Sequence, residues 1–137
     1  MELERFLEAQ KDTYYTALAE IKAGYKETHW MWWIFPQYKG LGYSSISQFY
    51  AIQSKEEAQE YWVHPILGER LRECMLSLLD LEADDAVEIF GPIDAQKLKS
   101  CATLFFCINR SWICEWVLEK FFIGEKDFAT VRLLIRE

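Results

Sequence analysis

Two histidines and one aspartate are the residues of this sequence best suited to move a proton. His29 precedes a run of tryptophans, His64 stands directly before a proline, and Asp94 follows a Gly-Pro turn. An imidazole can accept and donate a proton near neutral pH, and a carboxylate can also move one. His29, His64 and Asp94 are therefore the candidate catalytic residues.

Each of these residues also has a structural explanation. His29 can be a hydrogen-bonded side chain that anchors the buried segment after it. His64 can cap the helix that Pro65 is expected to begin, and Asp94 is suited to the N-cap of the next long helix. The catalytic and structural interpretations both remain open from the sequence.

The aromatic-rich segment from residue 30 to residue 38 is the candidate binding site for a planar ligand. Trp30, Trp32 and Trp33 can stack on a flat ring, at roughly 1–3 kcal/mol per stack, with Trp30 and Trp33 chosen as the ligand-binding pair. Gln37 and Tyr38 can hydrogen-bond the edge of that ring. Three large rings within four residues cannot all face one pocket, so at least two should belong to the core. We expect Trp32 to be a core residue, with Trp32→Ala costing roughly 3–5 kcal/mol of stability.

A third feature could bind an anion. Asp94, Lys97 and Ser100 recur at every third residue, which puts them on one stripe near a helix start. Helix amides, the helix dipole and a lysine together favour a phosphate, so Lys97 and Ser100 are predicted ligand-binding residues. The alternative is an N-cap aspartate beside a solvated lysine. Neither a Walker loop nor a dinucleotide-type glycine loop occurs in the sequence.

The cysteines and histidines do not have the spacing of a metal site. The four cysteines, Cys74, Cys101, Cys107 and Cys114, form no C-x-x-C pair, and there are only two histidines. We therefore expect no metal and no cofactor. The cysteines are expected to be reduced and mainly buried, with a catalytic cysteine as the alternative.

The spacing of apolar residues predicts helices throughout. Leu3, Phe6, Tyr14, Leu18 and Ile21 mark one face of a helix over residues 2–23 that ends at Gly24. Strand alternation is nowhere sustained. The further helices expected cover residues 45–52, 54–63 after a Ser-x-x-Glu capping box, 65–79, 84–90, 94–108, 112–123 and 127–135. Residues 29–37 are buried on all sides, so periodicity does not separate a short helix from a strand there, and we favour a short helix. The chain, residues 1–137, is predicted to be one compact all-α domain of about six to eight helices around an aromatic-rich core.

Composition narrows the classes of function. Hydrophobic residues make up 51% and aromatic residues 16% of the 137 residues, which is ample for one core. The formal net charge of −7 argues against broad binding of nucleic acid or an anionic membrane, although one local group could still hold a small phosphate. The start of the chain lacks the features of a signal peptide, and the apolar stretches are far shorter than the ~20 residues of a membrane span. A cytoplasmic location is expected.

Several segments together resemble a known family. They are His29-Trp30-Met31-Trp32, Phe35-Pro36-Gln37, Tyr50-Ala51-Ile52, Glu57-Ala58, Tyr61, His64-Pro65-Ile66-Leu67-Gly68, Arg70-Leu71, Glu88-Ile89-Phe90-Gly91, Asp94, Lys97-Leu98, Ser100, Thr103-Leu104-Phe105, Phe122, Gly124, Asp127 and Thr130. Their order and spacing resemble the domain-of-unknown-function 1810 family of small bacterial proteins. The resemblance implies an all-helical single domain and brings no established reaction.

The sequence departs from that family at one helix start. Members usually have G-S-P-D and a second serine where this chain has Gly91-Pro92-Ile93-Asp94 and Cys101. Some members carry the label calpastatin, but nothing in these residues supports calpain inhibition. A fainter similarity of size and aromatic-rich helical make-up links the chain to the NADAR hydrolases, which cleave ADP-ribose from modified bases; this is an analogy of fold.

Two functions fit these residues. The first is an aromatic pocket for a nucleotide-like or ADP-ribose-like small ligand, with or without hydrolysis of a glycosidic bond. The alternative is a non-catalytic protein-interaction module with an acidic surface. A DNA-related role is disfavoured by the charge balance. The oligomeric state and the choice between enzyme and binding module stay open at this stage.

Overall fold

The computed structural model describes residues 3–136, and helices form nearly all of its regular structure. Within that range the ten helices are α1 (Glu4–Lys11), α2 (Tyr14–Ala23), α3 (Met31–Ile34), α4 (Ser45–Phe49), α5 (Lys55–Val63), α6 (Leu67–Leu79), α7 (Ala86–Phe90), α8 (Pro92–Asn109), α9 (Trp112–Phe122) and α10 (Phe128–Arg136). An isolated parallel bridge joins Tyr38 to Ile52. The predicted all-α fold is confirmed, with more helices than the six to eight expected.

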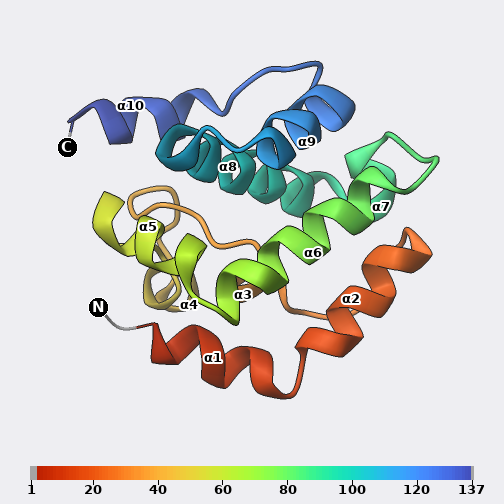
Figure 1. Cartoon of the computed structure of the whole chain (residues 1–137), viewed down its shortest axis with the longest axis horizontal. Helices are drawn as coiled ribbons and strands as arrows, with labels where there is room; N and C mark the ends of the chain where they lie inside the picture. Colours follow the sequence, from red (N-terminus) through yellow and green to blue (C-terminus); the bar gives the residue numbers. More distant parts are fainter. Residues whose placement is uncertain (1–2, 137) are drawn as a thin grey trace.

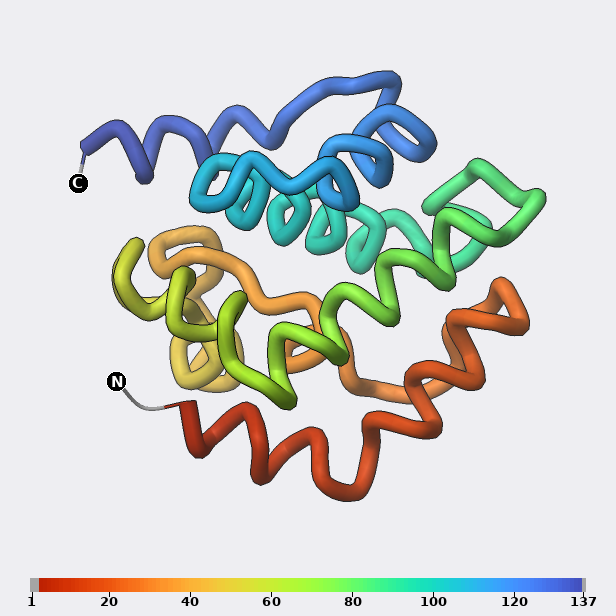
Figure 2. The backbone as a smooth tube through the Cα atoms, in the orientation of Figure 1, coloured from red at the N-terminus to blue at the C-terminus, as the bar shows by residue number. Residues whose placement is uncertain are grey.

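The longest helix, α8, lies at the centre of the molecule (Figure 1). It contacts α5, α7, α9 and α10, while α6 contacts α2, α5 and α9. The segment between α2 and α5 is irregular apart from the short helices α3 and α4, and Figure 2 shows it (orange to yellow) coiling behind α5 and α6. Helix α1 packs against α3. Residues 30–38 of this segment are buried or partly buried, whereas most of residues 39–49 are exposed.

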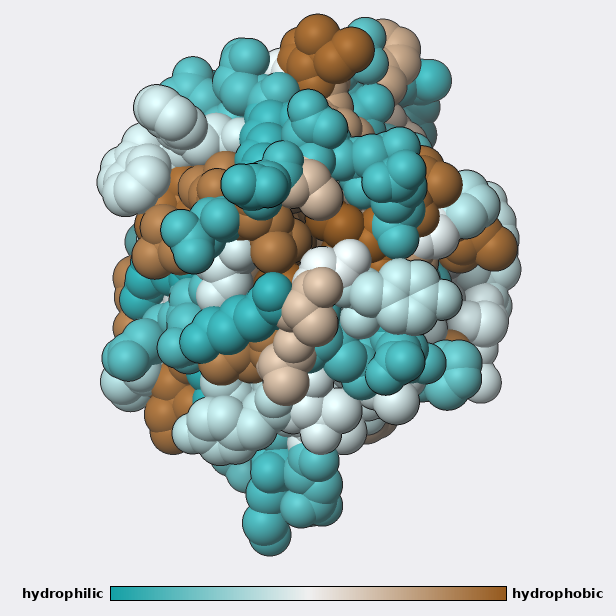
Figure 3. Space-filling model, turned by 90° about the vertical axis from the view of Figure 1, so that its right-hand side faces the viewer, coloured by the Kyte–Doolittle hydropathy of each residue, from teal (hydrophilic) through white to brown (hydrophobic). Residues whose placement is uncertain are grey.

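Aromatic side chains dominate the core. The largest fully buried side chains include Phe6, Trp30, Phe35, Tyr61 and Phe105. Their rings meet edge to face or tilted, as in the Phe6–Tyr61 pair, whose centroids lie 5.1 Å apart. The predicted aromatic-rich core is therefore confirmed. At the surface, apolar patches are interrupted by hydrophilic side chains, as Figure 3 shows for one face.

No helix among the described residues is both long enough and apolar enough to cross a bilayer.

The helix predicted over residues 2–23 is broken into α1 and α2 at Asp12 and Thr13. The Thr13 hydroxyl donates a hydrogen bond to the carbonyl of Ala9 at 2.6 Å and accepts one from the indole N–H of Trp33 at 2.9 Å. A threonine that bonds the preceding turn bends a helix. The break therefore lets the N-terminal helices wrap around Trp33, a tertiary contact that the apolar spacing does not reveal. The predicted end at Gly24 is confirmed, since Gly24 has a φ of +78°.

The junction between α5 and α6 requires a glycine. The predicted cap of α5 is present, because the Ser54 hydroxyl accepts the amide of Glu57 at 3.0 Å. Two helices then approach so closely that a Cβ atom on Gly68 would lie 1.9 Å from the carbonyl oxygen of Trp62. This contact gives the glycine of the His-Pro-Ile-Leu-Gly segment a packing role.

The start of α8 differs from the prediction. Asp94 was expected at the N-cap, but the helix begins at Pro92, with Gly91 as N-cap at a φ of +82°. Proline suits the first helical position because it has no N–H to leave unpaired. Asp94 consequently lies in the first turn of α8, and its carboxylate is available for contacts outside the helix.

Candidate ligand-binding site

A buried glutamate fixes the start of the indole-rich segment. The Glu20 carboxylate accepts hydrogen bonds from the amides of Glu27 and Thr28 at 2.7 and 3.0 Å. It also accepts the Thr28 hydroxyl at 2.6 Å and the indole N–H of Trp30 at 2.9 Å. Burial alone would raise the pKa of Glu20, but these hydrogen bonds outweigh it and lower the pKa to about 2. The ionised carboxylate therefore holds Trp30 in place.

The indole N–H groups of Trp30 and Trp33 both donate hydrogen bonds to other side chains of the protein. Trp30 is 1% exposed, and its ring packs against Phe35 and Phe90 with centroids 6.3 Å away in each case. Trp33 is partly buried and donates its N–H to Thr13 at 2.9 Å. Trp30 therefore packs in the core and Trp33 packs against it, and both also line the lysine pocket described below.

Trp32 is the tryptophan that faces outward, which corrects the expectation that it is a core residue. In the single turn of α3, Met31 and Ile34 are three residues apart and both buried, so Trp32 projects from a different side of the helix. It is partly buried. Among the described residues its side chain lines three neighbouring pockets, which we name the lysine, apolar and amide pockets.

The lysine pocket has a volume of about 230 Å³. It is defined by Lys26, His29, Asp94 and Lys97 together with the indole segment. The two oxygens of Asp94 bind different lysines, with Oδ1 2.8 Å from Nζ of Lys97 and Oδ2 3.0 Å from Nζ of Lys26. Nζ of Lys97 lies 4.0 Å from the centroid of the Trp32 ring, within cation–π range. A flat ring and two ammonium groups therefore share one hollow.

The charges of this pocket are set by the lysines. Burial would raise the pKa of Asp94, but hydrogen bonds from Lys97 and Lys26 and the charges of both lysines hold it below its usual value. Asp94 is therefore a carboxylate at neutral pH and cannot act as a proton donor there. Two ammonium groups and one carboxylate leave a net charge of +1, at the start of a helix whose dipole also favours anions. His29 is exposed at the rim.

The apolar pocket also borders Trp32 and has a volume of about 440 Å³. Leu41, Pro92 and Ile93 supply its apolar wall, and Gln37 and Lys97 also line it. Trp32 and Lys97 thus line both the lysine and the apolar pockets.

The amide pocket has a volume of about 300 Å³ and is lined by polar groups. Trp32, Gln37, Tyr38, Gln48 and Gln53 contribute to it, along with the Lys39–Gly42 loop. The isolated bridge fixes its floor, because the amide of Ile52 donates to the carbonyl of Gln37 at 2.8 Å. Glutamine amides carry both donors and acceptors, which suits the edge of a nucleobase.

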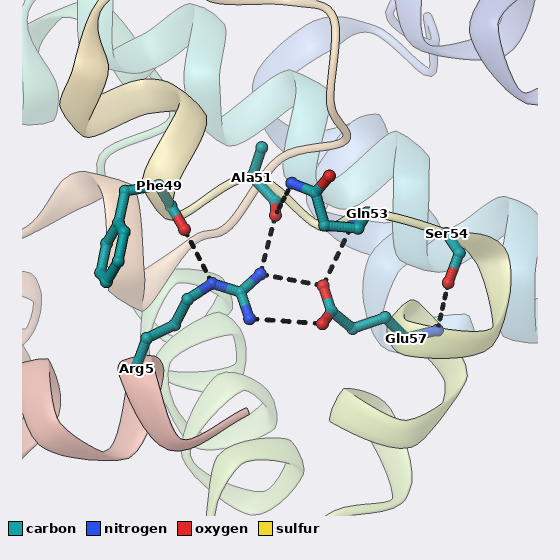
Figure 4. A network of polar contacts seen from close by, with 6 residues as sticks. All are labelled: Arg5, Phe49, Ala51, Gln53, Ser54 and Glu57. Atoms are coloured by element: carbon teal, nitrogen blue, oxygen red, sulfur yellow. Dashed lines mark hydrogen bonds and ion pairs between the residues drawn. The ribbon is translucent and has the colours of Figure 1, made fainter. Parts of the chain in front are cut away.

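An arginine of the first helix positions one wall of the amide pocket (Figure 4). The Arg5 guanidinium donates to the carbonyls of Phe49 and Ala51 at 2.7 and 2.8 Å and to the Glu57 carboxylate at 2.9 Å. Glu57 in turn accepts the amide of Gln53 at 2.9 Å. The loop between α4 and α5 is therefore held by a charge-assisted network that begins in α1.

Most of the sequence-predicted site residues meet around Trp32. His29, Trp30, Trp33, Asp94 and Lys97 all line the lysine pocket. Gln37 lines the apolar and amide pockets, and Tyr38, which is 2% exposed, lines the amide pocket.

His64 and Ser100 have structural contacts instead. Nδ1 of His64 accepts the amides of Ile66 and Leu67 at 3.0 and 3.2 Å and so caps the start of α6. The buried Ser100 hydroxyl donates to Asp127 at 3.1 Å and ties α8 to the segment before α10. The cap is the alternative foreseen for His64, whereas the contact of Ser100 follows from long-range packing.

Sequence reasoning missed three residues of the site. Trp32 was assigned to the core, and Lys26 and Arg5 were not singled out. The phase of Met31 and Ile34 in a helix could have identified Trp32 as the outward ring. The ion-pair partner of Lys26 lies 68 residues away in sequence, and the partners of Arg5 lie 44 to 52 residues away, so local patterns do not reveal these contacts.

The cysteines are all free and mostly buried. Burial raises the pKa of Cys74 and of Cys114 to about 12, so both remain thiols at neutral pH. Burial also raises the pKa of Cys101 and of the partly buried Cys107. Nucleophilic catalysis by a thiolate is therefore disfavoured. Within residues 3–136, no group of three or more His, Cys, Asp or Glu side chains is placed to hold a metal ion.

Comparison with known proteins identifies a family without an assigned activity. No curated protein matches the sequence. The conserved hypothetical protein Rv1873 from Mycobacterium tuberculosis has a similar crystal structure, with a TM-score of 0.95 and 41% sequence identity over 98% of this chain and 96% of that chain. The family model described as "Protein of unknown function (DUF1810)" matches residues 1–134, and the chain belongs to that family.

Proposed function

We propose that the protein binds a small nucleotide-like ligand, a class that includes ADP-ribose-like molecules, around Trp32. The observation that carries this proposal is that Trp32 is a wall common to the lysine, apolar and amide pockets. A nucleotide consists of a planar base with a polar edge, a sugar and an anionic phosphate. The three pockets offer matching surroundings for these parts: amide groups, apolar side chains and two lysines.

The ring of Trp32 would stack on the base. Its indole is partly exposed, in contrast to the packed ring of Trp30, so a ligand can reach it. Gln37 would hydrogen-bond the base edge, and Lys26 and Lys97 would bind the phosphate. Stacking of this kind contributes roughly 1–3 kcal/mol per base.

Hydrolysis of a glycosidic bond is the reaction that the same residues would support. His29, exposed at the rim of the lysine pocket, is the candidate acid or base. Asp94, held ionised by two lysines, would stabilise positive charge that develops on the sugar. Binding without reaction uses the same contacts, so binding is tested first.

A thermal-shift panel of nucleosides, nucleoside mono- and diphosphates and ADP-ribose tests the proposal. A ligand present at about 100 times its dissociation constant should add roughly 2.7 kcal/mol of stability. The shift should be smaller in Trp32→Ala and unchanged in Trp116→Ala, which removes a tryptophan that is 61% exposed on α9. If no compound in the panel shifts the wild-type melting temperature, the pocket proposal is wrong.

A non-catalytic interaction module is the second candidate. It is favoured by Trp112 and Trp116, one turn apart on α9 and 59% and 61% exposed. Exposed aromatic residues of this kind often bind protein partners. An absence of ligand shifts, combined with weaker partner binding by a Trp112→Ala/Trp116→Ala double variant, would favour this function.

A cytoplasmic location is part of the proposal. It is supported by four cysteines that are all free, as is usual where thiols are kept reduced. Fractionation of cells that express the tagged protein tests this expectation.

A further inference from the structure

The two lysines of the lysine pocket are already engaged by one side chain. Oδ1 of Asp94 lies 2.8 Å from Nζ of Lys97, and Oδ2 lies 3.0 Å from Nζ of Lys26. Although Asp94 lies in the first turn of α8, that helix has no side-chain cap, so its carboxylate is directed to the lysines and not to the helix amides. The side chains of the trio are 9–19% exposed, so the ion pairs are largely shielded from water.

We propose that Asp94 is an internal competitor for the phosphate of the ligand, and that its charge opposes a phosphate monoester more strongly than a phosphodiester. The inference rests on the proposed function. A phosphate can bind both lysines only if it displaces the Asp94 carboxylate from at least one of them. The phosphate of the ligand therefore competes with a carboxylate that is part of the same polypeptide chain as the lysines.

The charge of the incoming anion sets how strongly Asp94 opposes it. A phosphodiester carries one negative charge, whereas a phosphate monoester carries about −1.5 to −2 at pH 7. The displaced carboxylate stays on the first turn of α8, so its repulsion acts on either anion and is larger for the more highly charged monoester. The two lysines attract the monoester more strongly, and Asp94 offsets part of that preference.

Binding of two matched ligands to wild type and to Asp94→Asn tests this inference. The probes are adenosine 5′-monophosphate, a monoester, and adenosine 3′,5′-cyclic monophosphate, a diester with the same base, with inorganic phosphate as a third titrant. By calorimetry, we expect Asp94→Asn to bind both nucleotides and inorganic phosphate at least tenfold more tightly than wild type. The gain should be larger for the monoester than for the diester, because the removed charge repels the monoester more strongly.

Glu60→Gln is the matched control. It removes one negative charge from an exposed position on α5 and should leave all three affinities within twofold of wild type. Lys97→Met should weaken the monoester at least tenfold. Melting curves establish that each variant is folded.

The outcomes separate this inference from the proposed function. If wild type binds the monoester in a Trp32-dependent way but Asp94→Asn binds it no more tightly, the competitor role is wrong and the binding function stands. If Asp94→Asn tightens binding of the two nucleotides by the same factor, the charge of Asp94 does not act on the bound phosphate and that part of the inference is wrong. Asp94→Ser repeats the comparison if Asp94→Asn fails to fold. If neither protein binds a compound in these titrations or in the thermal-shift panel, the proposed function itself is wrong.

Discussion

Trp30 and Trp32 are two residues apart in sequence and have opposite surroundings. Trp30 is 1% exposed, with its N–H on the buried Glu20 carboxylate and its ring between Phe35 and Phe90. Trp32 is partly exposed, stacks under the Lys97 ammonium and borders three pockets. The buried indole has a complete set of protein partners, whereas one face of the outer indole has pocket space beside it.

The difference shows how a short, strongly apolar segment can serve two purposes. The buried half fixes the segment to α2 through Glu20, and this anchoring positions the exposed half against α8. Residue type does not distinguish the two roles, because both residues are tryptophans. Their hydrogen-bond partners and their exposure do distinguish them. Substitutions of Trp30 should therefore affect mainly stability, and substitutions of Trp32 mainly ligand binding.

Trp30→Ala should have the largest effect. Removing a fully buried ring typically costs about 3–5 kcal/mol, from lost burial and the cavity that remains. Urea denaturation measures this loss. Trp116→Ala, at a position that is 61% exposed, is the control and should change the free energy of unfolding by less than about 1 kcal/mol. Equal losses for the two variants would contradict the division into buried and exposed tryptophans.

Glu20→Gln should reduce stability in a pH-dependent way. The Glu20 pKa is lowered in the folded state from 4.5 to about 2, so its stabilisation is fully present above about pH 4.5. It is lost as the pH falls from there through about 2. With each pKa unit equivalent to ~1.4 kcal/mol, the contribution at pH 7 is at most about 3.5 kcal/mol.

Unfolding free energies between pH 2 and pH 7 check this expectation. The wild-type curve should fall more steeply with acid than the Glu20→Gln curve. Glu8→Gln, at an exposed position on α1, should follow the wild type. Parallel acid profiles for wild type and Glu20→Gln would show that Glu20 is not the anchor inferred here.

Trp32→Ala should cost less stability than Trp30→Ala and more affinity. We expect a loss of about 1–2 kcal/mol of unfolding free energy, because the ring is only partly buried. Loss of stacking should weaken nucleotide binding by about 1–3 kcal/mol, roughly 5- to 150-fold. Denaturation and calorimetry on the same preparation measure both. A stability loss as large as that of Trp30→Ala would return Trp32 to the core.

Ser100→Ala should have the smallest effect. It removes one hydrogen bond to the buried Asp127 carboxylate, worth about 1–2 kcal/mol. Nucleotide affinity should be unchanged, since the hydroxyl is committed to the contact with the α10 segment. A large loss of affinity with unaltered stability would assign Ser100 to the ligand, as its spacing from Lys97 suggests.

Local patterns predicted the helices well and the long-range contacts poorly. Ser54 and Gly24 act through neighbours within five residues, so their roles follow from sequence. The break at Thr13 depends on Trp33, 20 residues away, and the Asp94–Lys26 pair spans 68 residues. These contacts exist only after the helices pack, because no periodicity encodes which loop will meet which helix.

The candidate site was predictable to the same extent. Asp94 and Lys97 are three residues apart on one helix, and their joint presence in the lysine pocket follows from helical geometry. Trp30 is the N-cap of α3 and Trp32 lies within its single turn, so which of the two faces outward depends on where α3 begins.

The contacts of Arg5 with the α4–α5 loop connect helix α1 to a wall of the amide pocket. A ligand in the amide pocket should reduce the motion of that loop, and the loop carbonyls in turn fix the Arg5 side chain through hydrogen bonds. Docking of α1 and occupancy of the pocket are then thermodynamically linked, so amide protons of α1 should exchange with solvent more slowly once ligand is bound. A terminal helix distant in sequence would thus report on an event it does not touch.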